Sequence, residues 1–118
     1  MKYACLVYAE EATFEAMTTD ESVKLTDSAI DYDATLRERG QLIYAQALQP
    51  TTKAVTIRVR NGKASMTDGP FAETREHLAG FMLIEARDLN EAIEIVSAAP
   101  MARVASMEVR PFLDLSHS

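Results

Sequence analysis

Eighteen acidic and twelve basic side chains in 118 residues leave a net charge of −6 at pH 7 and a pI near 4.8. Proteins that bind nucleic acids use Lys and Arg to neutralise phosphates, so this balance argues against a nucleic-acid partner. Cys5 is the single cysteine, which excludes an internal disulfide, and no apolar run is long enough to span a membrane. We therefore expect a cytoplasmic protein in which residues 1–118 form one domain.

The N-terminal part of the chain predicts a strand and then a long helix. Residues 2–8 are apolar on both faces, as in a strand that is covered on both sides. Residues 10–17 form an acidic stretch that predicts a loose turn of helix. Thr18 and Glu21 have the capping-box spacing for a helix that ends at Gly40. Apolar residues at helical spacing predict the core-facing stripe of this helix: Val23, Leu25, Ala29, Ile30, Tyr32 and Leu36.

A second strand over residues 42–48 is followed by a β-hairpin. The pair Asn61-Gly62 is typical of a two-residue type I′ turn between alternating strands. This turn sets a register in which the apolar side chains of both strands share one face. The predicted cross-strand pairs are Ile57 with Met66, Val59 with Ala64, and Arg60 with Lys63, the last a like-charge pair tolerable only at an exposed tip.

The last third of the chain predicts a strand over residues 80–86, a helix and a final strand over residues 106–111. Asp88 and Glu91 have the spacing of an N-terminal helix cap, and Pro100 ends the helix. Residues 112–118 form a tail. The core-facing stripe of this helix is predicted at Leu89, Ala92, Ile93 and Val96.

The element order predicts an α+β fold. It is the ferredoxin-like β-α-β-β-α-β pattern with an inserted β-hairpin, in which two helices lie on one face of an antiparallel sheet. Residues 2–8 and 81–84 are apolar on both sides, so the second face of the sheet also needs a cover. Because closed twofold dimers dominate homo-oligomers, we expect a homodimer that packs sheet on sheet.

Turn residues and charges concentrate in residues 68–81, Asp-Gly-Pro-Phe-Ala-Glu-Thr-Arg-Glu-His-Leu-Ala-Gly-Phe. We call residues 68–77 of this stretch the signature loop. Asp68 can hold a turn or face a cleft. Arg75 can form an ion pair with either Asp68 or Glu73. His77 can act as an acid or a base near neutral pH. The candidate catalytic residues are Asp68 and His77, and the candidate binding residues are Pro70, Phe71, Glu73 and Arg75.

This stretch closely resembles the signature of the DGPF-domain branch of the YCII-related family. The Leu-Arg-x-x-Gly helix end, residues 83–92 and the Glu-Val-Arg-Pro of residues 108–111 extend the resemblance over nearly the whole chain. It implies a dimeric α/β barrel built on the ferredoxin-like fold. DGPF members are often encoded beside extracytoplasmic-function sigma factors, which implies a regulatory link. Arg75 stands where members commonly have Lys.

Relatives in the wider YCII group include enzymes that act on chlorinated aromatic ring products, with a His and an Asp as the proposed catalytic pair. That His lies on the first helix, whereas this sequence has no His between Thr18 and Gly40. His77 would have to reach the site from another direction.

These observations lead to three hypotheses about function. The first is a protein that binds a small acidic or cyclic metabolite in the cleft between helices and sheet, with the signature loop at its mouth. The second is a cofactor-independent lyase or isomerase in which Asp68 is the base or charge stabiliser. The third makes the signature loop purely structural. Metal-ligand spacing, a phosphate loop and a dinucleotide fingerprint are absent from the sequence, so we expect no cofactor and no metal.

Overall fold

The structure is a computed structural model that describes residues 1–115; residues 116–118 of the expected tail lie outside the described residues. Four strands form an antiparallel sheet in the order β2-β5-β1-β6, and two form a separate ribbon, β3-β4. The elements are β1 Lys2–Ala9, α1 Glu11–Glu15, α2 Thr19–Glu38, β2 Leu42–Ala47, η1 Thr51–Lys53, β3 Val55–Arg60, β4 Lys63–Asp68, β5 His77–Glu85, α3 Leu89–Ser97, η2 Pro100–Arg103 and β6 Ser106–Pro111.

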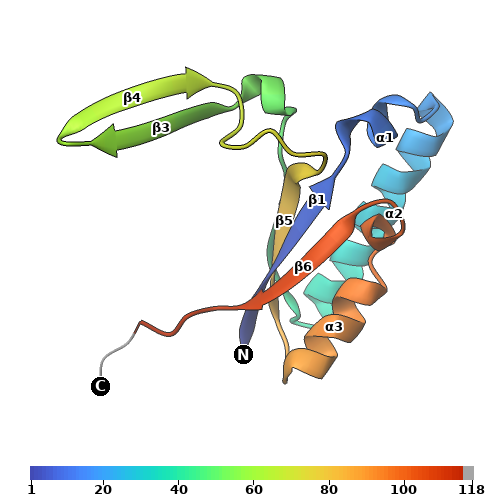
Figure 1. Cartoon of the computed structure of the whole chain (residues 1–118). Helices are drawn as coiled ribbons and strands as arrows, with labels where there is room; N and C mark the ends of the chain where they lie inside the picture. Colours follow the sequence, from blue (N-terminus) through green and yellow to red (C-terminus); the bar gives the residue numbers. More distant parts are fainter. Residues whose placement is uncertain (116–118) are drawn as a thin grey trace.

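This topology confirms the predicted α+β fold, with the β3-β4 hairpin inserted between the second and third strands of the ferredoxin-like sheet. Helices α2 and α3 lie on one face of the sheet, and within residues 1–115 no helix covers the other face (Figure 1). The hairpin and the C-terminal segment both project on the side of that uncovered face, which we call the open face. The described part of the chain contains no helix long and apolar enough to cross a membrane.

The core lies between the sheet and the two helices. Along β1 every second side chain is buried toward the helices, while the side chains between them are partly exposed on the open face. Cys5 is fully buried, and this burial raises its pKa to about 11, so its thiol is inert at neutral pH. The buried cluster comprises Tyr3, Cys5, Leu36, Leu42, Met82, Ile84, Ala86, Ala92, Ile95 and Val96.

Helix α2 has the predicted caps, but its predicted core stripe is wrong at Val23 and Ile30. The Thr18 hydroxyl and the Glu21 carboxylate form the capping box, and Gly40 adopts φ +72° after the helix end. Only Leu36 is buried, whereas Val23 and Ile30 are 52% and 60% exposed. The N-terminal half of the helix therefore stands away from the sheet.

The predicted core stripe of α3 is also partly wrong, because the buried face is rotated slightly around the helix. Asp88 caps this helix as predicted, its carboxylate accepting from the Glu91 N–H at 2.9 Å. Leu89 and Ile93 are nearly half exposed, and Ile95 is buried in their place. Leu89 and Ile93 follow the same helical period as the buried residues but lie at the edge of the apolar stripe. Residue spacing alone does not distinguish the edge of a stripe from its buried centre.

Strand β5 is longer than predicted, because it begins at His77 rather than Gly80. The last part of the expected signature loop is thus a strand paired with β1. Gly80 lies so close to β2 that a Cβ there would be 2.9 Å from the Gln46 carbonyl oxygen, so only glycine fits without movement. Strand β2 in turn ends at Ala47, one residue earlier than expected.

The hairpin forms in the predicted register. Asn61 and Gly62 adopt φ values of 54° and 74°, as a type I′ turn requires. The cross-strand pairs include Ile57 with Met66, Val59 with Ala64 and Arg60 with Lys63. We call residues 55–68 the arm, because the ribbon extends from the body as a separate projection (Figure 1).

Candidate functional site

A cavity of about 560 Å³ lies between the N-terminal half of α2 and the sheet. We call it the α2 cavity. It exists because α2 packs tightly only at Leu36, so the helix turns before that residue leave space above β2 and β5. The predicted stripe residues Leu25 and Ala29 face this space, whereas Tyr32 lines it and also packs against the buried cluster. Its other apolar lining residues include Val7, Phe14, Ile30, Met82, Met101 and Met107.

Polar side chains converge on this cavity from three elements. His77 comes from the start of β5, Glu11 from α1 and Asp33 from α2. The Glu11 carboxylate accepts a hydrogen bond of 2.9 Å from the backbone N–H of Thr51, which ties α1 to the segment after β2. Hydrogen bonding from Thr51 lowers the pKa of Glu11, and the nearby His77 lowers it further. Glu11 is therefore an ionised neighbour of His77 at neutral pH.

Asp33 has the opposite electrostatic character. Burial raises its pKa above the ordinary value of 3.8, with Arg37 acting in the other direction. Beside it, the Tyr32 hydroxyl donates to the Ile95 carbonyl oxygen at 2.6 Å, which fixes α2 to α3 at this level. The cavity thus has one carboxyl group whose ionisation is favoured and one whose ionisation is disfavoured.

Of the six candidate residues, His77 alone lines the α2 cavity. Asp68 is exposed at the end of β4, and Glu73 is exposed in the signature loop. Within the described residues, the Asp68 carboxylate makes no side-chain hydrogen bond and no ion pair, and Asp68 pairs with Val55 through the strand ladder. The turn after it is closed by Gly69, which adopts φ +103° and donates its N–H to the Ala54 carbonyl oxygen at 2.8 Å.

Arg75 pairs with neither of the two partners expected from the sequence. Its Nε lies 3.1 Å from the Glu10 carboxylate, which joins the signature loop to the start of α1. The Ser106 hydroxyl donates to the Glu76 carboxylate at 3.2 Å, which joins the loop to β6. Both contacts are exposed, so each contributes roughly 1 kcal/mol or less, but together they hold the loop beside the cavity.

Pro70 and Phe71 lie nearer the base of the arm. Pro70 lines a second hollow of about 350 Å³, which it shares with Lys53 and His77. Phe71 is 74% exposed, and the Arg58 guanidinium lies 5.3 Å from its ring centroid in a cation–π contact. Of the six candidate residues, His77 alone lines both hollows, which also share Leu48, Gln49, Pro50 and Leu78.

Sequence reasoning missed Glu10, Glu11 and Asp33. The first two lie in a stretch predicted only as a loose turn, and Asp33 is not among the residues that the sequence singled out. The position of Asp33 directly after Tyr32, at the edge of the apolar stripe, is the signal that could have found it. Within residues 1–115, no cluster of three or more His, Cys, Asp or Glu side chains has the arrangement of a metal site.

Three comparisons relate the chain to known proteins, two by sequence and one by fold. Residues 1–116 match the family model of the YCII-related domain. An uncharacterized protein of Rhizobium meliloti is 36% identical over 113 residues, which cover 94% of this chain and 91% of that protein. A solved structure of 5-chloro-2-hydroxyhydroquinone dehydrochlorinase (TftG) from Burkholderia phenoliruptrix, in complex with 2,5-dihydroxybenzoquinone, superposes with a TM-score of 0.57. It shares 10% identity and covers 96% of this chain and 94% of its own, a likeness of fold.

The raised pKa of Asp33 predicts that Asp33→Asn stabilises the protein at pH 7. Between pH 3.8 and the pKa of the folded state, the folded protein holds more protons at Asp33 than the unfolded chain, so wild-type stability falls as pH rises. We expect a rise in Tm of at most a few degrees at pH 7 that vanishes below pH 3.8, where Asp33 is neutral in both states. Thermal melts across this pH range test it.

Asp31→Asn is the matched control, because Asp31 is exposed on the same helix. An equal gain from Asp31→Asn, or a gain from Asp33→Asn that persists at low pH, would contradict the assignment.

Proposed function

The chain belongs to the YCII-related family, and from this premise we propose that it binds a small cyclic metabolite in the α2 cavity. The observation that carries the proposal is the cavity itself. Its volume of about 560 Å³ falls within the range of roughly 300–1,000 Å³ typical of small-molecule sites. Its lining is mainly apolar, and His77, Glu11 and Asp33 supply a few polar groups that would orient a ring.

The lining favours an uncharged ring over an anion. Glu11, Glu15 and Asp33 line the α2 cavity, whereas no Lys or Arg of the described chain does so. A carboxylate ligand would meet like charge without a guanidinium or ammonium partner. Hydroxyl groups on a ring, in contrast, would donate hydrogen bonds to these carboxylates. Of the acidic and cyclic ligands expected from the sequence, we therefore favour the cyclic one.

The signature loop would act at the mouth of the site. We propose that Arg75 and Glu73 influence ligand entry, Arg75 through its ion pair with Glu10 beside the cavity-lining Glu11. Pro70 would shape the second hollow on the other side of His77, whereas Phe71 lies outside the lining of both hollows. A regulatory link to an extracytoplasmic-function sigma factor and a cytoplasmic location both stay predictions. If the regulatory link exists, binding of a ligand in this cavity would be the signal that the protein passes on.

Calorimetric titration of the protein with hydroquinone and with 2,5-dihydroxybenzoate tests the binding proposal. We expect hydroquinone to bind and the carboxylate analogue to bind at least roughly tenfold more weakly, a difference of about 1.4 kcal/mol. Ala29→Trp should abolish binding because Ala29 lines the cavity, and Ala34→Trp should leave it intact because Ala34 is exposed outside that lining.

Tighter binding of the carboxylate analogue, or equal effects of the two tryptophan variants, would count against this site.

A second candidate is a cofactor-independent lyase of the kind expected from the sequence. Two features favour it: the fold likeness to a dehydrochlorinase and the position of His77 between two hollows with Glu11 nearby. In such a reaction the substrate would first form its keto tautomer, in which one hydroxyl loses its proton and the chlorine-bearing carbon gains one. A second ring hydroxyl would then give its proton to His77 while chloride leaves with the C–Cl electron pair, so that a quinone forms and HCl is lost overall. Asp68 would act only as a remote charge stabiliser, since it is exposed outside the cavity.

Chloride release from 5-chloro-2-hydroxyhydroquinone distinguishes the two candidates. If the chain is a lyase, release should fall by roughly 100-fold or more in His77→Gln and remain within about threefold in Asp68→Asn. Binding without chloride release in the wild type would support the binding role alone.

We further propose that two copies pair through the open face. Phe81 and Leu83 of β5 alternate with the buried Met82 and Ile84, so their side chains lie on that face. Tyr44 packs beside Phe81 with ring centroids 6.0 Å apart, yet Tyr44 is 50% exposed. An apolar strip of this kind along the sheet is the surface that a second copy would cover.

Sedimentation analysis at micromolar concentration checks the pairing. We expect a dimer for the wild type and a monomer for Leu83→Glu, because two copies would then bury unpaired carboxylates at the seam. Ile93→Glu, which changes an exposed residue of α3 on the opposite side of the sheet, should remain a dimer. A wild type that sediments as a stable monomer would refute the pairing.

A further inference from the structure

The second hollow, of about 350 Å³, adjoins the α2 cavity where β2 ends and β5 begins. The Leu48 N–H donates to the Ala79 carbonyl oxygen at 2.8 Å, which continues the contact of these two strands beyond the end of β2. Residues on both sides of this hydrogen bond line both spaces: Leu48, Gln49, Pro50, His77 and Leu78. The two spaces therefore share a border that is formed by two adjacent segments.

Hydrogen bonds at the base of the arm fix the rest of the second hollow. The Gly69 N–H donates to the Ala54 carbonyl oxygen at 2.8 Å, and the Thr56 hydroxyl donates to the Gly69 carbonyl oxygen at 2.9 Å. These bonds hold Gly69 against the start of β3. The next residue, Pro70, then lines the same hollow as Lys53 and Ala54. The hollow is therefore formed by backbone that hydrogen bonds hold in place.

The acidic side chains line one space, and the Lys side chain lines the other. Glu11, Glu15 and Asp33 line the α2 cavity. Lys53 lines the second hollow, and none of the described residues that line this hollow is Asp or Glu. Within residues 1–115 the Lys53 ammonium has no ion pair and no side-chain hydrogen bond. An anionic group would therefore be repelled on one side of His77 and attracted on the other.

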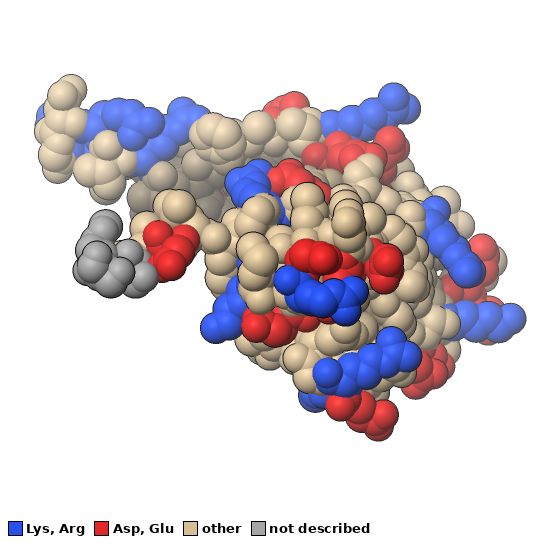
Figure 2. Space-filling view, turned by 90° about the horizontal axis from the view of Figure 1, so that it is seen from below, with Lys and Arg blue, Asp and Glu red and all other residues tan. Residues whose placement is uncertain are grey.

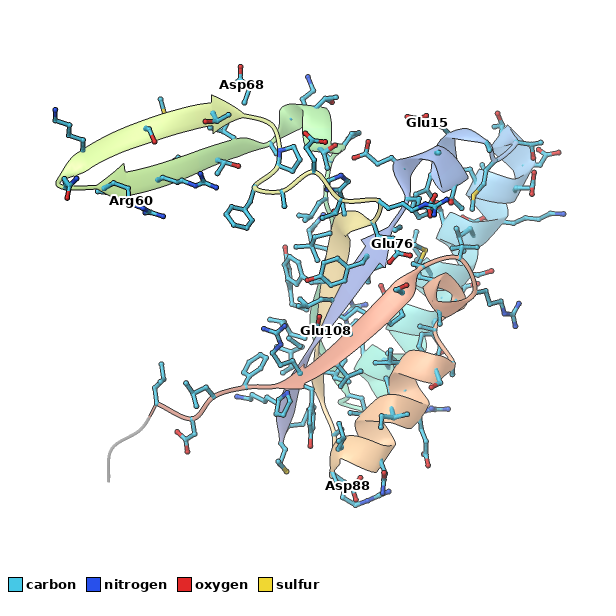
Figure 3. The ribbon with its side chains drawn as sticks, in the orientation of Figure 1. Glu15, Arg60, Asp68, Glu76, Asp88 and Glu108 are labelled. Atoms are coloured by element: carbon cyan, nitrogen blue, oxygen red, sulfur yellow. The ribbon has the colours of Figure 1, made fainter. Side chains whose placement is uncertain are left out.

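Two acidic residues close to the second hollow along the chain or in space do not line it. Asp68, two positions before Pro70, points away from the body of the molecule (Figure 3). The Glu11 carboxylate lies on the side of the α2 cavity and accepts a hydrogen bond from the Thr51 N–H at 2.9 Å. Lys53 is thus the cation that a ligand would meet in the second hollow.

We propose that one ligand occupies both spaces, with an uncharged ring in the α2 cavity and a carboxylate on a flexible tether beside Lys53. This inference rests on the function proposed above and specifies the class of its ligand, a hydroxylated ring with an acidic side chain. The tether passes His77, which lines both spaces. A carboxylate directly on the ring stays in the acid-lined cavity, whereas a carboxylate on a tether leaves it.

The expected gain from Lys53 is modest, because its side chain is exposed. An exposed ion pair changes an equilibrium constant by roughly fivefold at most. The sign of the charge effect is therefore more informative than its size. A negative charge should weaken the binding of a short ligand, which keeps it among the carboxylates, and strengthen the binding of a longer ligand, which brings it to Lys53.

Calorimetric titration with acids and their neutral amides tests this reversal. The acids share a 4-hydroxyphenyl ring and differ in tether length: 4-hydroxybenzoate, 4-hydroxyphenylacetate, 3-(4-hydroxyphenyl)propanoate and 4-(4-hydroxyphenyl)butanoate. We expect 4-hydroxybenzoate to bind roughly threefold more weakly than its amide, and at least one tethered acid to bind roughly threefold more tightly than its amide. Amides that bind as tightly as their acids at every tether length would overturn the proposal.

Lys53→Gln should remove the preference for the tethered acid over its amide. Lys63→Gln is the matched control, because it removes the same charge from a residue of β4 that lines neither space. Figure 2 shows Lys and Arg along the arm to which Lys63 belongs. A preference that persists in Lys53→Gln, or that is lost equally in Lys63→Gln, would overturn the role of Lys53.

Ala29→Trp tests whether the ring of the same ligand lies in the α2 cavity. It should weaken binding of the tethered acid at least roughly tenfold, and unaltered binding would overturn the joint occupancy. Hydroquinone separates the two proposals. If hydroquinone binds in the α2 cavity but no tethered acid gains from its charge, only the present inference fails. If neither hydroquinone nor any of the acids binds, both proposals fail.

Discussion

The central strands of the sheet are apolar on both faces, but helices cover only one of these faces in the described residues. Along β1 and β5, fully buried side chains alternate with half-buried ones, and the half-buried set includes Leu6, Phe81 and Leu83. A solvated sheet face normally has polar residues at these positions. Every projecting segment, both the arm and the C-terminal segment, extends on this uncovered side (Figure 1). The organisation of the molecule beyond its core depends on this one-sided cover.

The α2 cavity has a related cause. Helix α2 is anchored at its C-terminal end by Leu36 and by the hydrogen bond from Tyr32 to the Ile95 carbonyl oxygen. Its N-terminal end is stabilised locally by the capping box rather than by packing on the sheet. A helix fastened in this way can keep apolar side chains such as Leu25 over an unfilled space. That space is the one in which we propose that the ligand binds.

The signature loop connects the arm, the cavity and β6. Its charged side chains mostly make contacts between elements, Arg75 with Glu10 and Glu76 with Ser106. Asp68 and His77, at its two ends, lie in different places: Asp68 on the face of the arm that carries Val55 and His77 in the lining of the two hollows. A stretch that looks like one motif along the chain thus serves two surfaces. This division is why a single Asp–His pair does not form.

Local interactions determined what could be read from the sequence. The capping box of α2, the Asp88 cap of α3, the left-handed glycine after α2 and the type I′ hairpin each depend on residues within a few positions of one another. Spacing was therefore sufficient to predict them. The fold class followed from the order of these elements. The tertiary structure alone decided which apolar stripes are buried, that β5 begins at His77, and that Arg75 meets Glu10. Each of these depends on contacts between distant segments, and a helical or charged pattern does not specify its distant partner.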